Sequence, residues 1–138
     1  MSSSADPRQQ RTPAEVLGFT TGQLVQEIGY DDDVDLELRD AMEDLIGAEL
    51  EDEDCQEIVD AVVLWWREED GDLTDALVDS LTTLDAGAPI WLLSPKAGRD
   101  GHVSPAEVQE AAETAGLRVM SPMSRAKDWT GTRLASRN

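Results

Sequence analysis

The spacing of apolar residues divides the chain into alternating strands and helices. Residues 58–66 and 89–93 are short, nearly unbroken apolar runs, which are typical of strands buried on both faces. Residues 34–46 and 73–84 instead carry apolar side chains three or four positions apart, with acidic residues between them, and predict amphipathic helices. Gly47 follows the first of these helices, at the position where glycine commonly ends a helix.

Capping residues define where several helices begin and end. Thr12 and Ser104 are each followed by proline and then, at the third position, by glutamate, so both predict the start of a helix. Asp72 is the predicted cap of the second amphipathic helix, and Gly87 is its predicted end. The helix that begins after Ser104 is expected to end at Gly116.

Three further segments complete the predicted elements. Residues 23–28 fit either a strand or a helix, and we expect a strand that ends at Gly29. Residues 117–123 and 130–135 predict an antiparallel hairpin at a sheet edge. Because the other strands alternate with helices, they should form a mainly parallel sheet covered by helices on both faces.

The whole pattern predicts a small three-layer Rossmann-like α/β fold with a C-terminal antiparallel hairpin. Residues 13–138 are expected to form one domain, and residues 1–12, rich in Ser, Gln and Arg, a disordered N-terminal arm. Trp65 and Trp66 are neighbours on a strand, so at least one should pack beneath a helix. We expect core packing for Trp91 and edge packing for Trp129.

Acidic residues dominate the chain, which has a formal net charge of −19. Residues 27–79 hold 22 acidic and two basic residues, whereas residues 118–138 have a net charge of +4. Because phosphates would meet like charge, direct nucleic-acid binding is not expected, and a basic protein is the expected kind of partner. The acidic interaction face predicted from these clusters comprises Asp31, Asp32, Asp33, Asp35, Glu51, Asp52, Glu53 and Asp54.

The cysteine content and the lengths of the apolar runs predict the cellular compartment. Cys55 is the only cysteine, so no disulfide can form within the chain and a reducing compartment is expected. Residues 1–12 contain no apolar stretch that would make a signal peptide or an anchor. The longest wholly apolar run, residues 61–66, is far too short to span a membrane. We therefore expect a cytoplasmic protein without a membrane span.

The loop over residues 94–104 is the predicted ligand site. It follows a buried strand at the carboxyl end, where open α/β sheets place ligands, and it leads into the start of a helix. A phosphate or carboxylate would suit its cationic side chains, although Lys96 and Arg99 could instead pair with the protein's own acids. The predicted anion crevice comprises Gly29, Trp66, Arg67, Lys96, Arg99, His102 and Ser104.

Neither a metal site nor a catalytic constellation is predicted. A calcium loop begun at Asp31 would place Leu36 where glycine is required, and the acidic clusters are better interpreted as solvated loops. His102 is the only histidine and has no recognisable nucleophile motif around it. Cys55 lies among acids, which disfavour a reactive thiolate. We assign no catalytic residue, no metal and no cofactor.

Two segments carry a family resemblance. Val59-Asp60-Ala61-Val62-Val63-Leu64-Trp65-Trp66-Arg67, and Ile90 to Lys96 with Gly98 to Val103, resemble an actinobacterial family designated domain of unknown function 3052 (DUF3052). The resemblance runs from about Leu17 to Leu134 and implies no activity.

A broader likeness is to class I methyltransferases. Glu27-Ile28-Gly29 is similar to the end of their first strand, and Asp60 with the strand after it to their fourth. Residues 30–33, Tyr-Asp-Asp-Asp, replace the glycine-rich turn, and the second and third strands have no counterpart. The likeness therefore implies a reduced scaffold and names no cofactor.

Three functions are compatible with these features. The first is a non-catalytic interaction or regulatory protein that uses its acidic face on a basic partner. The second is a binder of a small anionic ligand, nucleotide-like or phosphorylated, or a weak enzyme, that uses the predicted crevice. The third is a nucleic-acid mimic, which is a special case of the first. The sequence sets no oligomeric state.

Overall fold

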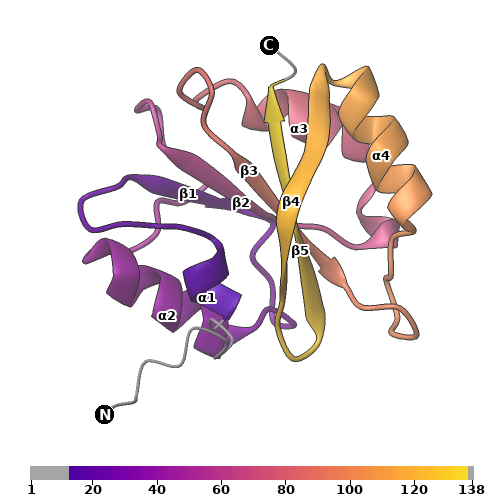
Figure 1. The fold of residues 1–138 in the computed structure, drawn as a ribbon, viewed down its shortest axis with the longest axis horizontal. Helices are drawn as coiled ribbons and strands as arrows, with labels where there is room; N and C mark the ends of the chain where they lie inside the picture. The colour runs from indigo at the N-terminus through magenta and orange to yellow at the C-terminus, as the bar shows by residue number, and fades with distance from the viewer. Residues whose placement is uncertain (1–12, 137–138) are drawn as a thin grey trace.

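The computed structural model describes residues 13–136, with the backbone alone described at residues 13 and 121–125. Five strands form one sheet in the order β1-β2-β3-β5-β4 (Figure 1). Of the described strands, β5 alone runs against the others, because it pairs in antiparallel fashion with both β3 and β4. The elements are α1 (Pro13–Val16), β1 (Val25–Ile28), α2 (Leu36–Ile46), β2 (Ala61–Trp65), the 3-10 turn η1 (Glu68–Asp70), α3 (Leu73–Ser80), β3 (Ile90–Pro95), α4 (Pro105–Thr114), β4 (Leu117–Arg125) and β5 (Trp129–Ser136).

Helices cover both faces of the sheet, which confirms the predicted three-layer α/β architecture. α1 and α2 lie on one face, and α3 and α4 lie on the other (Figure 1). Successive side chains of β2 alternate between these faces, so that Val63 and Trp65 pack toward α2 while Val62 and Leu64 pack toward α3 and α4. All five residues of β2 are buried, as its continuous apolar run predicts.

The N-terminal boundaries follow from capping and pairing. The strand predicted at residues 23–28 is confirmed, because β1 pairs in parallel with β2. α2 begins at Leu36 because the side chain of Asp35 accepts a hydrogen bond from the Leu38 N–H at 3.0 Å and caps the helix. Its end at Gly47, with φ of 76°, is as predicted. Thr12, the predicted cap of α1, and the predicted arm over residues 1–12 lie outside the described residues.

The predicted end of the second amphipathic helix is wrong. α3 ends at Ser80, well before Gly87. The Val59 N–H donates to the Thr83 carbonyl at 2.8 Å, and the Asp85 N–H donates to the Val59 carbonyl at 3.0 Å. Residues 83–85 are therefore extended beside Val59 in a short parallel bridge, and the helix cannot continue through them.

The C-terminal elements confirm the predicted hairpin and correct the position of one tryptophan. β4 is the edge strand, and β5 lies between β3 and β4. Trp129, at the start of β5, is consequently 3% exposed rather than at an edge, and its ring meets that of Trp65 edge to face, with centroids 4.9 Å apart. Trp91 lies in the core, as predicted, and its indole N–H donates to the Leu17 carbonyl at 3.1 Å. The helix predicted after Ser104 is confirmed as α4, and the Ser104 hydroxyl caps it.

Gly29 marks the closest approach between the ends of β1 and β2. Its φ is 83°, and a Cβ atom at this position would lie 2.2 Å from the Trp65 carbonyl oxygen. Real Cβ atoms do not approach a backbone atom so closely, so one of the two strand ends would have to move. Gly18 has a similar φ of 76° but no atom within 4 Å of the corresponding Cβ position.

We expect Gly29→Ala to be much more destabilising than Gly18→Ala. Both substitutions place a side chain in the left-handed region, which costs about 1–3 kcal/mol. Only Gly29→Ala also forces overlap with the Trp65 carbonyl, which should add about 1–3 kcal/mol. Urea unfolding of the two variants and the wild type measures the difference, and equal losses of stability would show that the two strand ends can separate freely.

Candidate functional site

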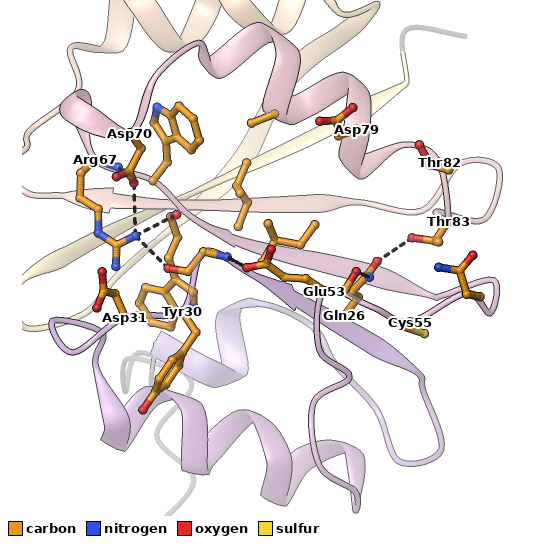
Figure 2. A pocket seen from close by; sticks show the side chains of 17 residues that line it. Gln26, Tyr30, Asp31, Glu53, Cys55, Arg67, Asp70, Asp79, Thr82 and Thr83 are labelled. Atoms are coloured by element: carbon orange, nitrogen blue, oxygen red, sulfur yellow. Dashed lines mark hydrogen bonds and ion pairs between the residues drawn. The ribbon is translucent and has the colours of Figure 1, made fainter.

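The carboxyl ends of β1 and β2 border a hollow of about 600 Å³, here called the acidic hollow (Figure 2). Arg67 and Asp70 lie at one end of it, and Cys55 and Thr83 lie at the other (Figure 2). Its wall includes residues from β1, the loop before β2, the end of β2, and α3 with the turn after it. The lining residues with polar side chains are Gln26, Tyr30, Asp31, Glu53, Gln56, Trp66, Arg67, Asp70, Asp79, Thr82 and Thr83.

Arg67 is the only cationic residue of this lining, and all three of its guanidinium nitrogens are engaged. Nε donates to Oδ2 of Asp33 at 2.9 Å, and Nη2 donates to Oδ1 of the same carboxylate. Nη1 donates to the Gly29 carbonyl at 2.8 Å and the Trp65 carbonyl at 3.2 Å, and lies 3.3 Å from Oδ2 of Asp70. The residue is 7% exposed, so most of this cation is turned toward the fold.

The charges around Arg67 stabilise one another. Burial alone would lower the pKa of Arg67, but the carboxylates of Asp33 and Asp70 outweigh it, and the pKa is raised above its ordinary value. The hydrogen bond from Arg67 lowers the pKa of Asp33, although partial burial opposes this effect. Asp33 is therefore held in its ionised form, and this residue of the predicted acidic face is used within the fold.

A second buried ion pair lies beneath the same loops, and sequence reasoning missed it. Glu27 on β1 accepts from Nε of Arg39 at 2.5 Å, from Nη2 of Arg39 at 2.8 Å and from the indole N–H of Trp65 at 2.9 Å. The hydrogen bond to Glu27 raises the pKa of Arg39. The sequence did contain a signal: Arg39 and Arg67 are the only basic residues within 27–79, and both are directed to carboxylates of the same segment.

Carboxylates consequently outnumber cations in the acidic hollow. Asp31, Glu53, Asp70 and Asp79 line it together with the single guanidinium of Arg67. Glu53 accepts from the Gly29 N–H at 2.9 Å, and Asp70 accepts from the backbone N–H of Arg67 at 2.9 Å, so two of the four are held in place by main-chain donors. The hollow has the electrostatic character of a site for a cation.

Trp66 supplies the acidic hollow with an apolar surface. The residue is 9% exposed, and its indole Nε1 is the only enclosed side-chain polar atom in residues 13–136 with no hydrogen-bond partner. A buried donor without a partner costs about 1–3 kcal/mol, and native structures contain few of them. The acidic hollow therefore combines carboxylates with one largely buried aromatic residue.

The residues of the predicted anion crevice lie in two places. Gly29, Trp66 and Arg67 line the acidic hollow, whereas Lys96 and His102 line a second hollow of about 490 Å³ beside α4. The structure therefore divides the predicted crevice between two hollows that have no lining residue in common.

Arg99 and Ser104 line neither hollow. Nη1 of Arg99 lies 3.2 Å from Oδ1 of Asp128, in an exposed pair of the kind that contributes little to stability. The Ser104 hydroxyl accepts from the Glu107 N–H at 3.2 Å. The sequence also allowed Lys96 and Arg99 to pair with the protein's own acids instead of a ligand. The structure shows such a pair for Arg99, while no carboxylate of the described residues pairs with Lys96.

The predicted acidic face is partly used for structure. Asp33 binds Arg67, Asp35 caps α2, Asp52 accepts from the Asp54 N–H at 2.9 Å, and Glu53 holds Gly29. The backbone of Glu51 bonds to both neighbours of Gln26, accepting from Glu27 at 2.7 Å and donating to Val25 at 2.8 Å, so it covers the free edge of β1. Asp31, Asp32 and Asp54 are exposed and hold no cation among the described residues.

Two further features are absent from the described residues. Within residues 13–136, no group of three or more His, Cys, Asp or Glu side chains is arranged to hold a metal ion. None of the helices in this part of the chain has the length and apolar character needed to cross a membrane.

Comparison with solved structures identifies the class of fold. The chain is similar to the mitomycin 7-O-methyltransferase MmcR, with a TM-score of 0.62 and 13% identity over 90% of this chain and 52% of that one. It is also similar to the magnesium protoporphyrin IX methyltransferase ChlM of Synechocystis, solved with bound SAM, with a TM-score of 0.57 and 12% identity over 89% and 76% of the two chains. The fold is thus the Rossmann-like fold of methyltransferases, and the chain spans about half the length of MmcR.

Comparison of sequences identifies the family. The chain belongs to the family described as Protein of unknown function (DUF3052), whose sequence profile matches residues 14–138. An uncharacterized protein of Mycobacterium bovis is 47% identical over 121 residues, which cover 88% of this chain and 76% of that protein. The family resemblance expected from residues 59–67 and 90–103 is confirmed.

Asp33→Asn should reduce the dependence of stability on pH. Because the pKa of Asp33 is lowered in the folded protein, ionised Asp33 stabilises the fold above its unfolded pKa, and this stability is lost as the pH falls below about 4. We expect Asp33→Asn to cost about 1–2 kcal/mol at pH 7, since the carboxylate is about half exposed, and less at pH 3.

Urea unfolding between pH 7 and pH 3 measures this effect. Asp32→Asn, which removes a neighbouring exposed carboxylate with no cation partner among the described residues, is the matched control. If the free energies of unfolding of the wild type and Asp33→Asn differ by the same amount from pH 7 to pH 3, the assigned role of the ion pair is wrong.

Proposed function

We propose that this protein is a non-catalytic interaction protein that binds a basic segment of a partner protein in the acidic hollow. The observation that carries the proposal is the excess of carboxylates in that hollow, where Arg67 is already engaged by the fold. A lysine or arginine side chain would meet Asp31, Glu53, Asp70 and Asp79 with no free cation competing for them.

The shape and chemistry of the acidic hollow support an extended peptide. The hollow runs from Arg67, past Gln26 and Glu53, to Thr83 and Cys55 (Figure 2). A peptide carries backbone amides as well as cationic side chains, and the amide and hydroxyl groups of Gln26, Gln56 and Thr82 line the same hollow. The overall charge of −19 would also speed the approach of a basic partner.

Methyl transfer is not proposed, although the fold is that of methyltransferases. ChlM was solved with bound SAM, and the glycine-rich turn that follows the first strand of class I methyltransferases is replaced here by residues 30–33. In this chain the space beside Gly29 is taken by the Trp65 carbonyl, and Arg67 closes over the Gly29 carbonyl. These residues do not fit a methyl-donor cofactor, and residues 30–33 add three carboxylates.

Nucleic-acid mimicry is a narrower form of the same proposal. In that form the exposed carboxylates of Asp31, Asp32 and Asp54 would imitate phosphates toward a nucleic-acid-binding protein. If duplex DNA displaces the bound partner, nucleic-acid mimicry is favoured. If duplex DNA does not affect the binding, the partner uses a surface unrelated to nucleic-acid binding.

A pentalysine peptide tests the acidic hollow directly. We expect saturable binding that weakens as the NaCl concentration rises, because exposed charge interactions are screened by salt. Removing two carboxylates of the hollow with Asp31→Asn and Asp79→Asn should raise the Kd about 3- to 30-fold, since each exposed ion pair contributes up to about 1 kcal/mol. Isothermal titration calorimetry on the full chain measures both effects.

The control removes the same charge elsewhere. Asp40→Asn with Asp44→Asn neutralises two exposed carboxylates of α2 that do not line the acidic hollow. If this pair weakens binding as much as Asp31→Asn with Asp79→Asn, the peptide responds to overall charge alone and the proposed site is wrong. Neutralising Asp33 or Asp35 is a poor test, because both residues hold the fold together.

A further inference from the structure

The hollow beside α4 differs in character from the acidic hollow, and the two share no lining residue. It lies between α4 and the antiparallel part of the sheet, with walls from β3, β4 and β5. From the side chains that line it, we propose that this α4 hollow binds a small amphipathic anion, in which a carboxylate or phosphate is joined to an apolar body.

Buried hydroxyl groups without partners are the first observation behind the proposal. Ser94 and Thr132 line the α4 hollow, are 5% and 7% exposed, and make no side-chain hydrogen bond within the described residues. Among the described residues, Trp66 Nε1 is the only side-chain polar atom that is fully enclosed and has no hydrogen-bond partner. The hydroxyl oxygens of Ser94 and Thr132 are therefore not fully enclosed and reach open space. That open space is the hollow which both residues line.

The register of the strands places a third hydroxyl with these two. Ser94 on β3 is paired with Thr130 on β5, and directly paired residues of antiparallel strands point to the same face. Thr130 and Thr132 are two positions apart on β5 and also share that face. Three hydroxyl donors from two neighbouring strands therefore converge on the α4 hollow, and hydroxyl donors are well suited to an oxyanion.

Lys96 supplies the charge. It is partly buried, follows β3, and has no ion pair within the described residues, whereas Arg39, Arg67 and Arg99 are each paired with a carboxylate. Arg118, Lys127 and Arg133 likewise have no ion pair within the described residues, but of the unpaired cations Lys96 is the one that lines the α4 hollow.

His102 adds a second polar group at the mouth. Its Nδ1 lies 2.9 Å from the Pro95 carbonyl oxygen, which can only accept, so Nδ1 carries a proton and Nε2 is left for a ligand. In this tautomer Nε2 can accept a hydrogen bond from a hydroxyl group of a ligand.

The remaining wall explains why the ligand should be amphipathic. Val103, Val108 and Val119 contribute apolar surface from the loop, from α4 and from β4. The volume of about 490 Å³ lies within the range of small-molecule sites, which combine mainly apolar walls with a few placed polar groups. An inorganic anion would leave this apolar surface unused.

Octanoate and octyl phosphate are suitable probes, with 1-octanol and inorganic phosphate as the comparison ligands. We expect saturable binding of at least one of the two amphipathic anions, at least tenfold tighter than that of 1-octanol or of inorganic phosphate. Isothermal titration calorimetry on the full chain gives the affinities, and the tighter of the two anions identifies the preferred head group.

Two variants locate the site. Lys96→Met and Thr132→Val should each weaken binding of the preferred anion about tenfold, because each removes one interaction with a charged head group. Thr132→Val should leave the unfolding free energy of the ligand-free protein unchanged or raised, since it removes an unpaired buried hydroxyl. Lys127→Met removes an exposed lysine that does not line the α4 hollow and should leave the affinity unchanged.

Several outcomes would overturn the proposal. These are an absence of saturable binding, equal binding of 1-octanol or of inorganic phosphate, and wild-type affinity in both Lys96→Met and Thr132→Val. Failure of the α4 hollow would leave the acidic hollow untouched, because the pentalysine peptide and its variants report on a separate set of residues.

Discussion

The guanidinium of Arg67 closes the carboxyl edge of the parallel sheet. Where β1 and β2 end, the carbonyls of Gly29 and Trp65 have no strand partner, and Arg67 donates to both. The same side chain binds Asp33 in the loop before α2 and Asp70 in the turn before α3, so two strands and two loops share one buried cation. A buried charge is costly unless it is paired and hydrogen-bonded, and Arg67 is paired with two carboxylates and donates from all three nitrogens.

The acidity of the surface follows from how the two basic residues of segment 27–79 are used. Arg67 and Arg39 are both turned inward, toward Asp33 and Glu27, and of the carboxylates around the hollow only Asp70 is paired with either of them. A methyltransferase-like sheet without the strands beyond β1 leaves that edge open, and the backbone of Glu51 covers it with a single bridge.

Local signals in the sequence were sufficient for most of the elements. The caps Asp35, Ser104 and Asp72, and the continuous apolar run of β2, depend on neighbours within a few residues, and the structure confirms each of them. The end of α3 was missed because it depends on Val59, which binds residues 83–85 from far away in the chain. Trp129 was misplaced for the same reason, since no local pattern says that β5 inserts between β3 and β4.

The candidate site depended even more on long-range geometry. Arg67 and Asp33 are 34 positions apart, and their contact follows from the parallel pairing of β1 with β2. Sequence reasoning could place Trp66 and Lys96 after neighbouring strands at one edge of the sheet. It could not show that Trp66 lines the hollow beside β1 while Lys96 lines the hollow beside α4, because each hollow is formed by residues from elements that are far apart in the chain.

The division gives the two hollows opposite electrostatic requirements. A cation approaching the acidic hollow is attracted by the whole protein, so added salt opposes its binding. An anion approaching Lys96 is repelled by the same net charge, so added salt assists its approach, and its binding must rely on enclosed donors and apolar contact. The partly buried position of Lys96, beside the hydroxyls of Ser94 and Thr132, provides these short-range contacts. The two proposed activities can therefore be separated by ionic strength as well as by mutation, because the field that favours one opposes the other.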